Sequence, residues 1–150
     1  MAYETLTYSR DDRVATITLN RPDRLNAISR GMPDEIRAAV EQANRDDLVH
    51  VIVVQGAGRA SCPGYDLKSA AEQPRGTGGS QEMPWDPLID FQLMDHNTQC
   101  FQSLWRSYKP TVCKVHGYAV AGGTDIALSC DLVVMAEDAR IGYPPARVWG

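Results

Sequence analysis

Residues 109–131 read KPTVCKVHGYAVAGGTDIALSCD, and this stretch indicates the fold class. The run 111–117 is rich in β-branched residues and ends on glycine, which predicts a strand that leads into a turn. Gly122 and Gly123 then open a predicted helix with an apolar run at 126–130. A strand, a glycine turn and a helix in succession indicate an α/β fold.

The residues before this stretch repeat the same kinds of element. Residues 14–19 alternate apolar residues with threonine, which predicts a half-buried strand closed by a turn at 20–23. Pro33, Asp34 and Glu35 predict a helix start, because proline and acidic residues favour the first turn. The β-branched run 49–54 predicts a strand covered on both faces.

The remaining segments complete the predicted architecture. Residues 69–87 are polar and rich in glycine and proline, which predicts a long loop. A helix is expected over 86–108, because Lys109-Pro110 disfavours its continuation. Residues 132–135 predict another buried strand.

Composition excludes several classes of protein. The chain has 150 residues, 43% of them apolar, and a net charge of −4, which fits one folded domain and excludes a disordered chain. No apolar run is long enough to span a membrane, and residues 1–13 lack a signal pattern. The acidic balance and dispersed arginines disfavour nucleic acid as a partner.

The four cysteines, at 62, 100, 113 and 130, lack the close spacing of a zinc motif. We therefore expect reduced thiols in a cytoplasmic protein, and no metal site.

Two glycine turns, at 56–64 and 117–123, follow predicted buried strands. Glycine lets backbone N–H groups approach a ligand closely, and a helix start favours an oxygen with negative charge. Two such donors form an oxyanion hole, although glycine turns after strands are also common as purely structural features. Neither turn has the phosphate-loop pattern or the dinucleotide-binding pattern, which disfavours a nucleotide enzyme.

Three segments together resemble the enoyl-CoA hydratase/isomerase family of the crotonase superfamily: NRPDRLNAI at 20–28, GAGRASCPGYDL at 56–67, and residues 109–131. The resemblance implies a spiral of β-β-α units, an acyl-coenzyme A thioester as substrate, and no separate cofactor. It also implies a homotrimer or hexamer in the complete protein. Residues 1–150 would form an incomplete acyl-CoA-binding core, because Trp149-Gly150 falls in the middle of the family's fold, before its C-terminal helical trimerisation region.

The resemblance also assigns roles to residues. The backbone amides of Tyr65 and Gly122 would stabilise a thioester enolate, and Arg24 and Ala27 would meet the adenine end of coenzyme A. Arginine suits the latter role because a cation pairs with phosphate. The implied substrate-binding residues are Arg24, Ala27, Gly64, Tyr65, Asp66, Leu67, Lys68, Gly122 and Tyr143.

The acid–base positions depart from the family pattern. Asp125 stands where a hydratase carries its first glutamate, and Pro145 stands at the second, where it cannot transfer a proton. Asp125 is also a typical acid for a helix start. Tyr143 could donate a hydrogen bond near the missing acid. His96, Asp90 and Asp95 are alternative acid–base groups or ordinary surface groups, and His116 is expected to be structural.

The sequence thus predicts an acyl-CoA enzyme of hydratase or isomerase type, of the kind used in fatty acid metabolism, with Asp125, Tyr65 and Gly122 as catalytic groups. One alternative keeps the oxyanion hole but changes the reaction to isomerisation, decarboxylation or C–C hydrolysis. Another is a non-catalytic subunit that binds acyl-CoA.

Overall fold

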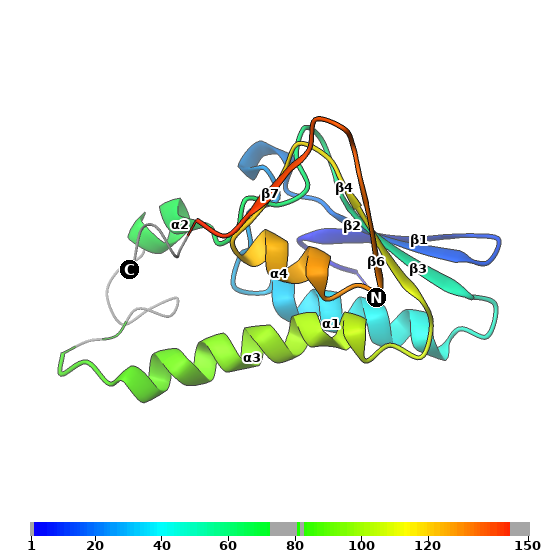
Figure 1. Cartoon of the computed structure of the whole chain (residues 1–150). Helices are drawn as coiled ribbons and strands as arrows, with labels where there is room; N and C mark the ends of the chain where they lie inside the picture. Colours follow the sequence, from blue (N-terminus) through cyan, green and yellow to red (C-terminus); the bar gives the residue numbers. More distant parts are fainter. Residues whose placement is uncertain (1, 73–80, 82, 145–150) are drawn as a thin grey trace.

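A five-stranded sheet forms the centre of the computed structural model, which describes residues 2–72, 81 and 83–144 (Figure 1). The first two strands are antiparallel and the others are parallel. In spatial order the strands are β1 (Leu6–Asp11), β2 (Val14–Leu19), β3 (Val51–Gly56), β4 (Thr111–Val115) and β6 (Leu132–Met135).

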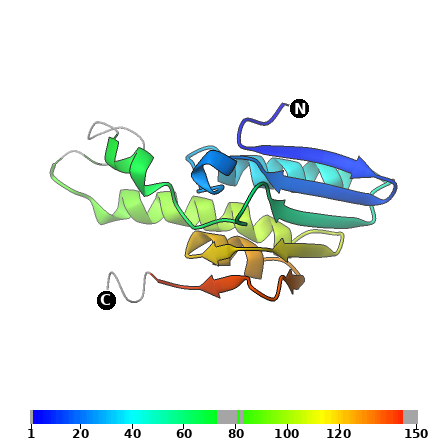
Figure 2. The same cartoon turned by 90° about the horizontal axis from the view of Figure 1, so that it is seen from above.

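Three helices pack along one face of this sheet, where the apolar core lies (Figures 1 and 2). They are α1 (Met32–Arg45), α3 (Pro87–Trp105) and α4 (Gly122–Leu128). A second, two-stranded parallel sheet pairs β5 (Tyr118–Val120) with β7 (Arg140–Gly142). Two short helices complete the described elements: η1 (Pro22–Arg24) and α2 (Leu67–Glu72).

The order of elements confirms the mixed α/β class and its repeating unit. Two strands precede a helix in β1-β2-α1, and again in β4-β5-α4. The strands over 14–19 and 132–135 and the helices α1, α3 and α4 all occur where the sequence predicted them. Strands β1, β5 and β7 were not predicted, since each lies in a short or largely polar segment.

Three local predictions were wrong. Residues 132–135 form the expected strand, β6, but the strand is not buried: Leu132, Val134 and Met135 are exposed, because β6 is the outermost strand of the described sheet. The strand near residue 50 is not covered on both faces, because Ile52 and Val54 are buried whereas Val51 and Val53 are partly exposed. The helices cover only one face of the sheet, so burial alternates along the strand. The long loop expected over 69–87 is helical at its start, in α2, and its residues 73–80 and 82 lie outside the described part of the chain.

Helix α3 divides into a buried half and an exposed half. Its C-terminal half packs on α1 and α4 through Cys100, Phe101 and Leu104. Its N-terminal half extends beyond the sheet (Figures 1 and 2) and exposes a row of apolar side chains. These are Leu88, Ile89, Phe91, Leu93 and Met94. Among the described residues, no helix combines the length and hydropathy needed to span a bilayer.

Replacing Leu104 by alanine should therefore destabilise the fold. Leu104 is completely buried, so the change removes packed methyl groups and leaves a cavity, which costs about 2–5 kcal/mol. Urea unfolding measures the change in the free energy of unfolding. Leu88→Ala on the same helix is the matched control, because Leu88 is 56% exposed and should change stability little. Equal losses in the two variants would contradict the observed packing of α3.

Candidate functional site

The two glycine turns of the sequence lie against each other. Cys62, in the first turn, forms a parallel bridge with Ala119 in β5. The Cys62 amide donates to the Tyr118 carbonyl at 2.9 Å, and the Val120 amide donates to the Cys62 carbonyl at 3.0 Å. These backbone bonds fix the first turn beside the segment that leads into α4.

Gly64 and Gly122 allow this close approach. Gly64 has a φ of +101°, and a Cβ atom on it would lie 3.2 Å from the Val120 carbonyl oxygen. A Cβ atom on Gly122 would lie 2.7 Å from Cδ1 of Ile28 and 3.1 Å from Cε2 of Tyr65. The Tyr65 ring therefore packs directly against Gly122, and larger residues are excluded at both glycines.

The amides of Tyr65 and Gly122 are available as donors. Ile28 bridges the Tyr65 segment by bonds to the Gly64 carbonyl and the Asp66 amide, which leaves the Tyr65 N–H outside the bridge. Gly122 is the first residue of α4, where amides have no acceptor within the helix. Among the described residues, neither amide has a hydrogen-bond acceptor.

Ala121 holds the turn before Gly122 in an unusual conformation. Its φ is +50° and its ψ is −125°, a region that L-residues other than glycine rarely adopt. The Ala121 amide donates to the Gly142 carbonyl at 3.0 Å, and the Thr124 hydroxyl donates to the same oxygen at 2.7 Å. Strand β7 thus anchors the turn that presents the Gly122 amide.

A network missed by the sequence analysis joins residues 21–28 to the first glycine turn. The fully buried Asn26 side chain accepts from the Arg21 amide and donates to the carbonyls of Ala57 and Ala60, each at 2.8–2.9 Å. The Arg21 guanidinium also pairs with the Asp66 carboxylate at 2.8 Å, where the Asp66 side chain is only 6% exposed. Two features of the sequence could have indicated this network. They are the asparagine Asn26 and the opposite charges of Arg21 and Asp66, all of which lie within the segments that resemble the family.

Asp125 and Tyr65 interact electrostatically across the site. Asp125 is exposed as a residue, and partial burial of its carboxyl raises the pKa of that group. Burial also raises the pKa of the Tyr65 hydroxyl, and the nearby charge of Asp125 adds to this effect. The Asn97 side chain on α3 donates to the Tyr65 hydroxyl at 3.4 Å and opposes the rise. Asp125 lies in the first turn of α4, which begins at Gly122, so its carboxyl is on the same short helix as the Gly122 amide.

The other residues implied by the resemblance lie around these turns in different settings. Arg24 is exposed at the end of η1, whereas Ala27 is buried behind it. Leu67 is exposed, as is Lys68, which lies 3.8 Å from Glu72. Tyr143 is exposed after β7. The roles of these residues in substrate binding stay predictions, and the Pro145 position lies outside the described residues.

The two histidines of the sequence analysis differ in their settings. His116 has its Nε2 atom 2.9 Å from the Gly58 carbonyl, and its amide bonds to the Ser61 hydroxyl, so it joins the two glycine turns structurally. His96 is exposed on α3, with its Nε2 atom 3.0 Å from an oxygen of Asp34 on α1.

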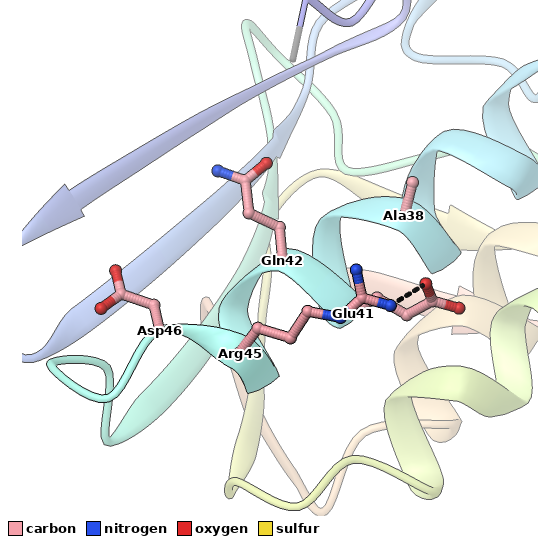
Figure 3. A pocket seen from close by; sticks show the side chains of 5 residues that line it. All are labelled: Ala38, Glu41, Gln42, Arg45 and Asp46. Atoms are coloured by element: carbon pink, nitrogen blue, oxygen red, sulfur yellow. Dashed lines mark hydrogen bonds and ion pairs between the residues drawn. The ribbon is translucent and has the colours of Figure 1, made fainter.

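A surface depression of about 340 Å³ lies away from the predicted site residues (Figure 3). Its lining comes from α1 and the residue that follows it, with Arg45 pointing back toward Glu41 across a distance of 3.5 Å. The lining residues are Ala38, Glu41, Gln42, Arg45 and Asp46. One helix supplies nearly the whole lining, and none of the predicted site residues is part of it.

Comparison with known proteins identifies relatives of the chain. Residues 9–148 match the family model described as enoyl-CoA hydratase/isomerase. A probable enoyl-CoA hydratase of Mycobacterium bovis is 31% identical over 99% of this chain and 52% of its own length. A 1,2-epoxyphenylacetyl-CoA isomerase of Escherichia coli is 34% identical over 67% of this chain and 36% of its own.

Solved structures agree with the sequence relatives. An enoyl-CoA hydratase of Mycobacterium smegmatis superimposes with a TM-score of 0.88 and 49% identity, over 99% of this chain and 52% of that one. The matches cover between 36% and 52% of the lengths of these relatives.

The raised pKa of Asp125 predicts a pH-dependent effect of Asp125→Asn on stability. The folded state binds this proton more tightly than the unfolded state, so the contribution to stability is present below about pH 4 and is lost as pH rises through the raised pKa. Asparagine stays neutral, so the variant should gain stability relative to the parent between about pH 3 and pH 7. Urea unfolding at the two pH values measures this, and a difference independent of pH would contradict the prediction.

Proposed function

The chain belongs to the enoyl-CoA hydratase/isomerase family, and from that premise we propose that it acts on an acyl-coenzyme A thioester. The amides of Tyr65 and Gly122 donate hydrogen bonds to the thioester oxygen, where negative charge accumulates as an enolate forms. The observation that carries this proposal is the contact between the two glycine turns, with both amides lacking an acceptor among the described residues. Donors fixed before the reaction stabilise such an oxyanion without reorganisation.

Asp125 is the proposed acid–base group for hydration. Its carboxylate accepts a proton from water while the water oxygen bonds to the β-carbon of the enoyl group. The two amides stabilise the resulting enolate. The protonated carboxyl then returns a proton to the α-carbon, so that one molecule of water has been added. Its raised pKa supports both steps, because it makes the carboxylate a stronger base and keeps the carboxyl protonated to a higher pH.

The surrounding residues are proposed to hold the rest of the substrate. Arg24, exposed at the end of η1, pairs with a phosphate of coenzyme A, and Ala27 contacts the adenine end. Residues 64–68 line the acyl portion, and Tyr143 donates a hydrogen bond near it. No separate cofactor is required in this scheme, and the complete protein would assemble as a trimer or hexamer.

Double-bond isomerisation is the second candidate reaction. The charge of the Asp125 carboxylate acts on Tyr65. One mobile base is enough to remove a proton from one carbon and return it to another. A relative named as an isomerase is consistent with this reaction.

Titration with crotonyl-CoA by calorimetry, followed by assays with enoyl thioesters, tests the proposal. We expect saturable binding, and turnover that falls at least about 100-fold in Asp125→Ala, because the proposed acid–base group is lost. Hydration of crotonyl-CoA supports the first reaction, and double-bond shift alone supports the second. Binding without turnover would indicate a non-catalytic subunit, and no binding at millimolar ligand would overturn the acyl-CoA assignment.

Replacing Gly122 by valine tests the oxyanion hole in either reaction. Gly122 has no positive φ, so the substitution acts through the contacts of its side chain with Ile28 and Tyr65. We expect turnover to fall about 100-fold, the effect of losing one oxyanion donor. Gly31→Val is the matched control, because no atom lies within 4 Å of a Cβ there. Near-native turnover in a folded Gly122→Val protein would refute this placement of the donors.

A further inference from the structure

Three side chains with metal-binding atoms converge between α1 and α3, outside the site described above. Asp34 lies in the first turn of α1, and His96 and Cys100 lie one turn apart on the same face of α3. The Asp34 Oδ1 atom is 3.0 Å from His96 Nε2 and 3.8 Å from the Cys100 sulfur. The His96 Nε2 atom is 3.6 Å from the same sulfur.

The three distances, 3.0, 3.6 and 3.8 Å, lie within about 0.3 Å of the edges of a zinc coordination tetrahedron. Zinc binds sulfur at about 2.3 Å and nitrogen or oxygen at about 2.0–2.2 Å, so tetrahedral ligands lie about 3.3–3.6 Å apart. The same imidazole nitrogen faces both the carboxylate and the thiol. A proton-relay triad would need the two ring nitrogens to face different partners, so the arrangement fits one shared ion better.

We propose that Asp34, His96 and Cys100 bind one Zn²⁺ ion, with water at the fourth position. Imidazole and thiolate ligands favour Zn²⁺ over Mg²⁺, which prefers oxygen. Two of the ligands are exposed, so the ion can enter from solvent, whereas Cys100 is fully buried. The thiol releases its proton to solvent on binding. The ion then ties the start of α1 to the middle of α3.

Arg37 competes with the ion for Asp34. Its guanidinium donates to the same Oδ1 atom at 2.8 Å, one turn along α1. The Arg37 side chain is 41% exposed, so it can move into solvent when the ion binds. Its positive charge opposes a second cation nearby, and removing it should strengthen zinc binding.

Calorimetric titration of the chain with Zn²⁺, and with Co²⁺ as a spectroscopic probe, tests the site. We expect one ion per chain, a thiolate-to-cobalt charge-transfer band, and tighter binding in Arg37→Gln. His96→Gln and Cys100→Ala should weaken binding by more than about tenfold, because even residues behind metal ligands change affinity by about 10–100-fold. Loss of the charge-transfer band in Cys100→Ala identifies the sulfur ligand.

His50→Gln is the matched control for His96→Gln, since both histidines are exposed. Far-UV circular dichroism checks that each variant folds, and His96→Gln keeps the test valid if Cys100→Ala does not. Failure to saturate with millimolar Zn²⁺ would overturn the proposal. So would binding that persists in folded His96→Gln, or that is lost equally in His50→Gln.

Discussion

The geometry of the candidate site depends on the hydrogen bonds of the fully buried Asn26 side chain. This side chain satisfies one backbone donor and two backbone acceptors that come from separate parts of the chain. A buried polar group without such partners would cost about 1–3 kcal/mol, so the three bonds strongly favour one arrangement of the loops. The Arg21–Asp66 pair extends the same restraint to the residue after Tyr65. These contacts hold the backbone donors in place, so the side chains of the donor residues are not needed for that.

This dependence explains why residues distant from the proposed chemistry matter to it. Oxyanion stabilisation relies on donors that are already positioned, and small displacements weaken it. The Tyr65 amide is fixed through Ile28 and the Asn26 network, whereas the Gly122 amide is fixed through Ala121 and β7. The two donors therefore come from separately anchored turns whose contact requires glycine at position 122.

Sequence periodicity predicted most of the main elements, because strands such as 14–19 and helices such as α1 bury regular apolar patterns. Periodicity did not predict β1, because apolar and polar residues alternate only weakly in that strand. It also did not predict which faces of β3 are buried, because this depends on helices that are distant in the sequence. The resemblance drew attention to Tyr65 and Gly122, but not to Asn26, because hydrogen bonds between distant loops leave no periodic signal. The cysteine spacing carried no information on the proposed zinc site, since its three side chains include Asp34, which lies more than sixty residues from the other two.

The exposed half of α3 has a consequence for the behaviour of the chain in solution. The exposed apolar side chains of this half form the kind of surface that proteins normally bury. Strand β6, at the edge of the described sheet, adds the exposed residues Leu132 and Val134. Apolar patches and open strand edges both promote self-association and aggregation. Protein concentration is therefore an experimental variable for this chain. Folding and ligand affinity are properties of a single molecule only at concentrations where the chain does not associate.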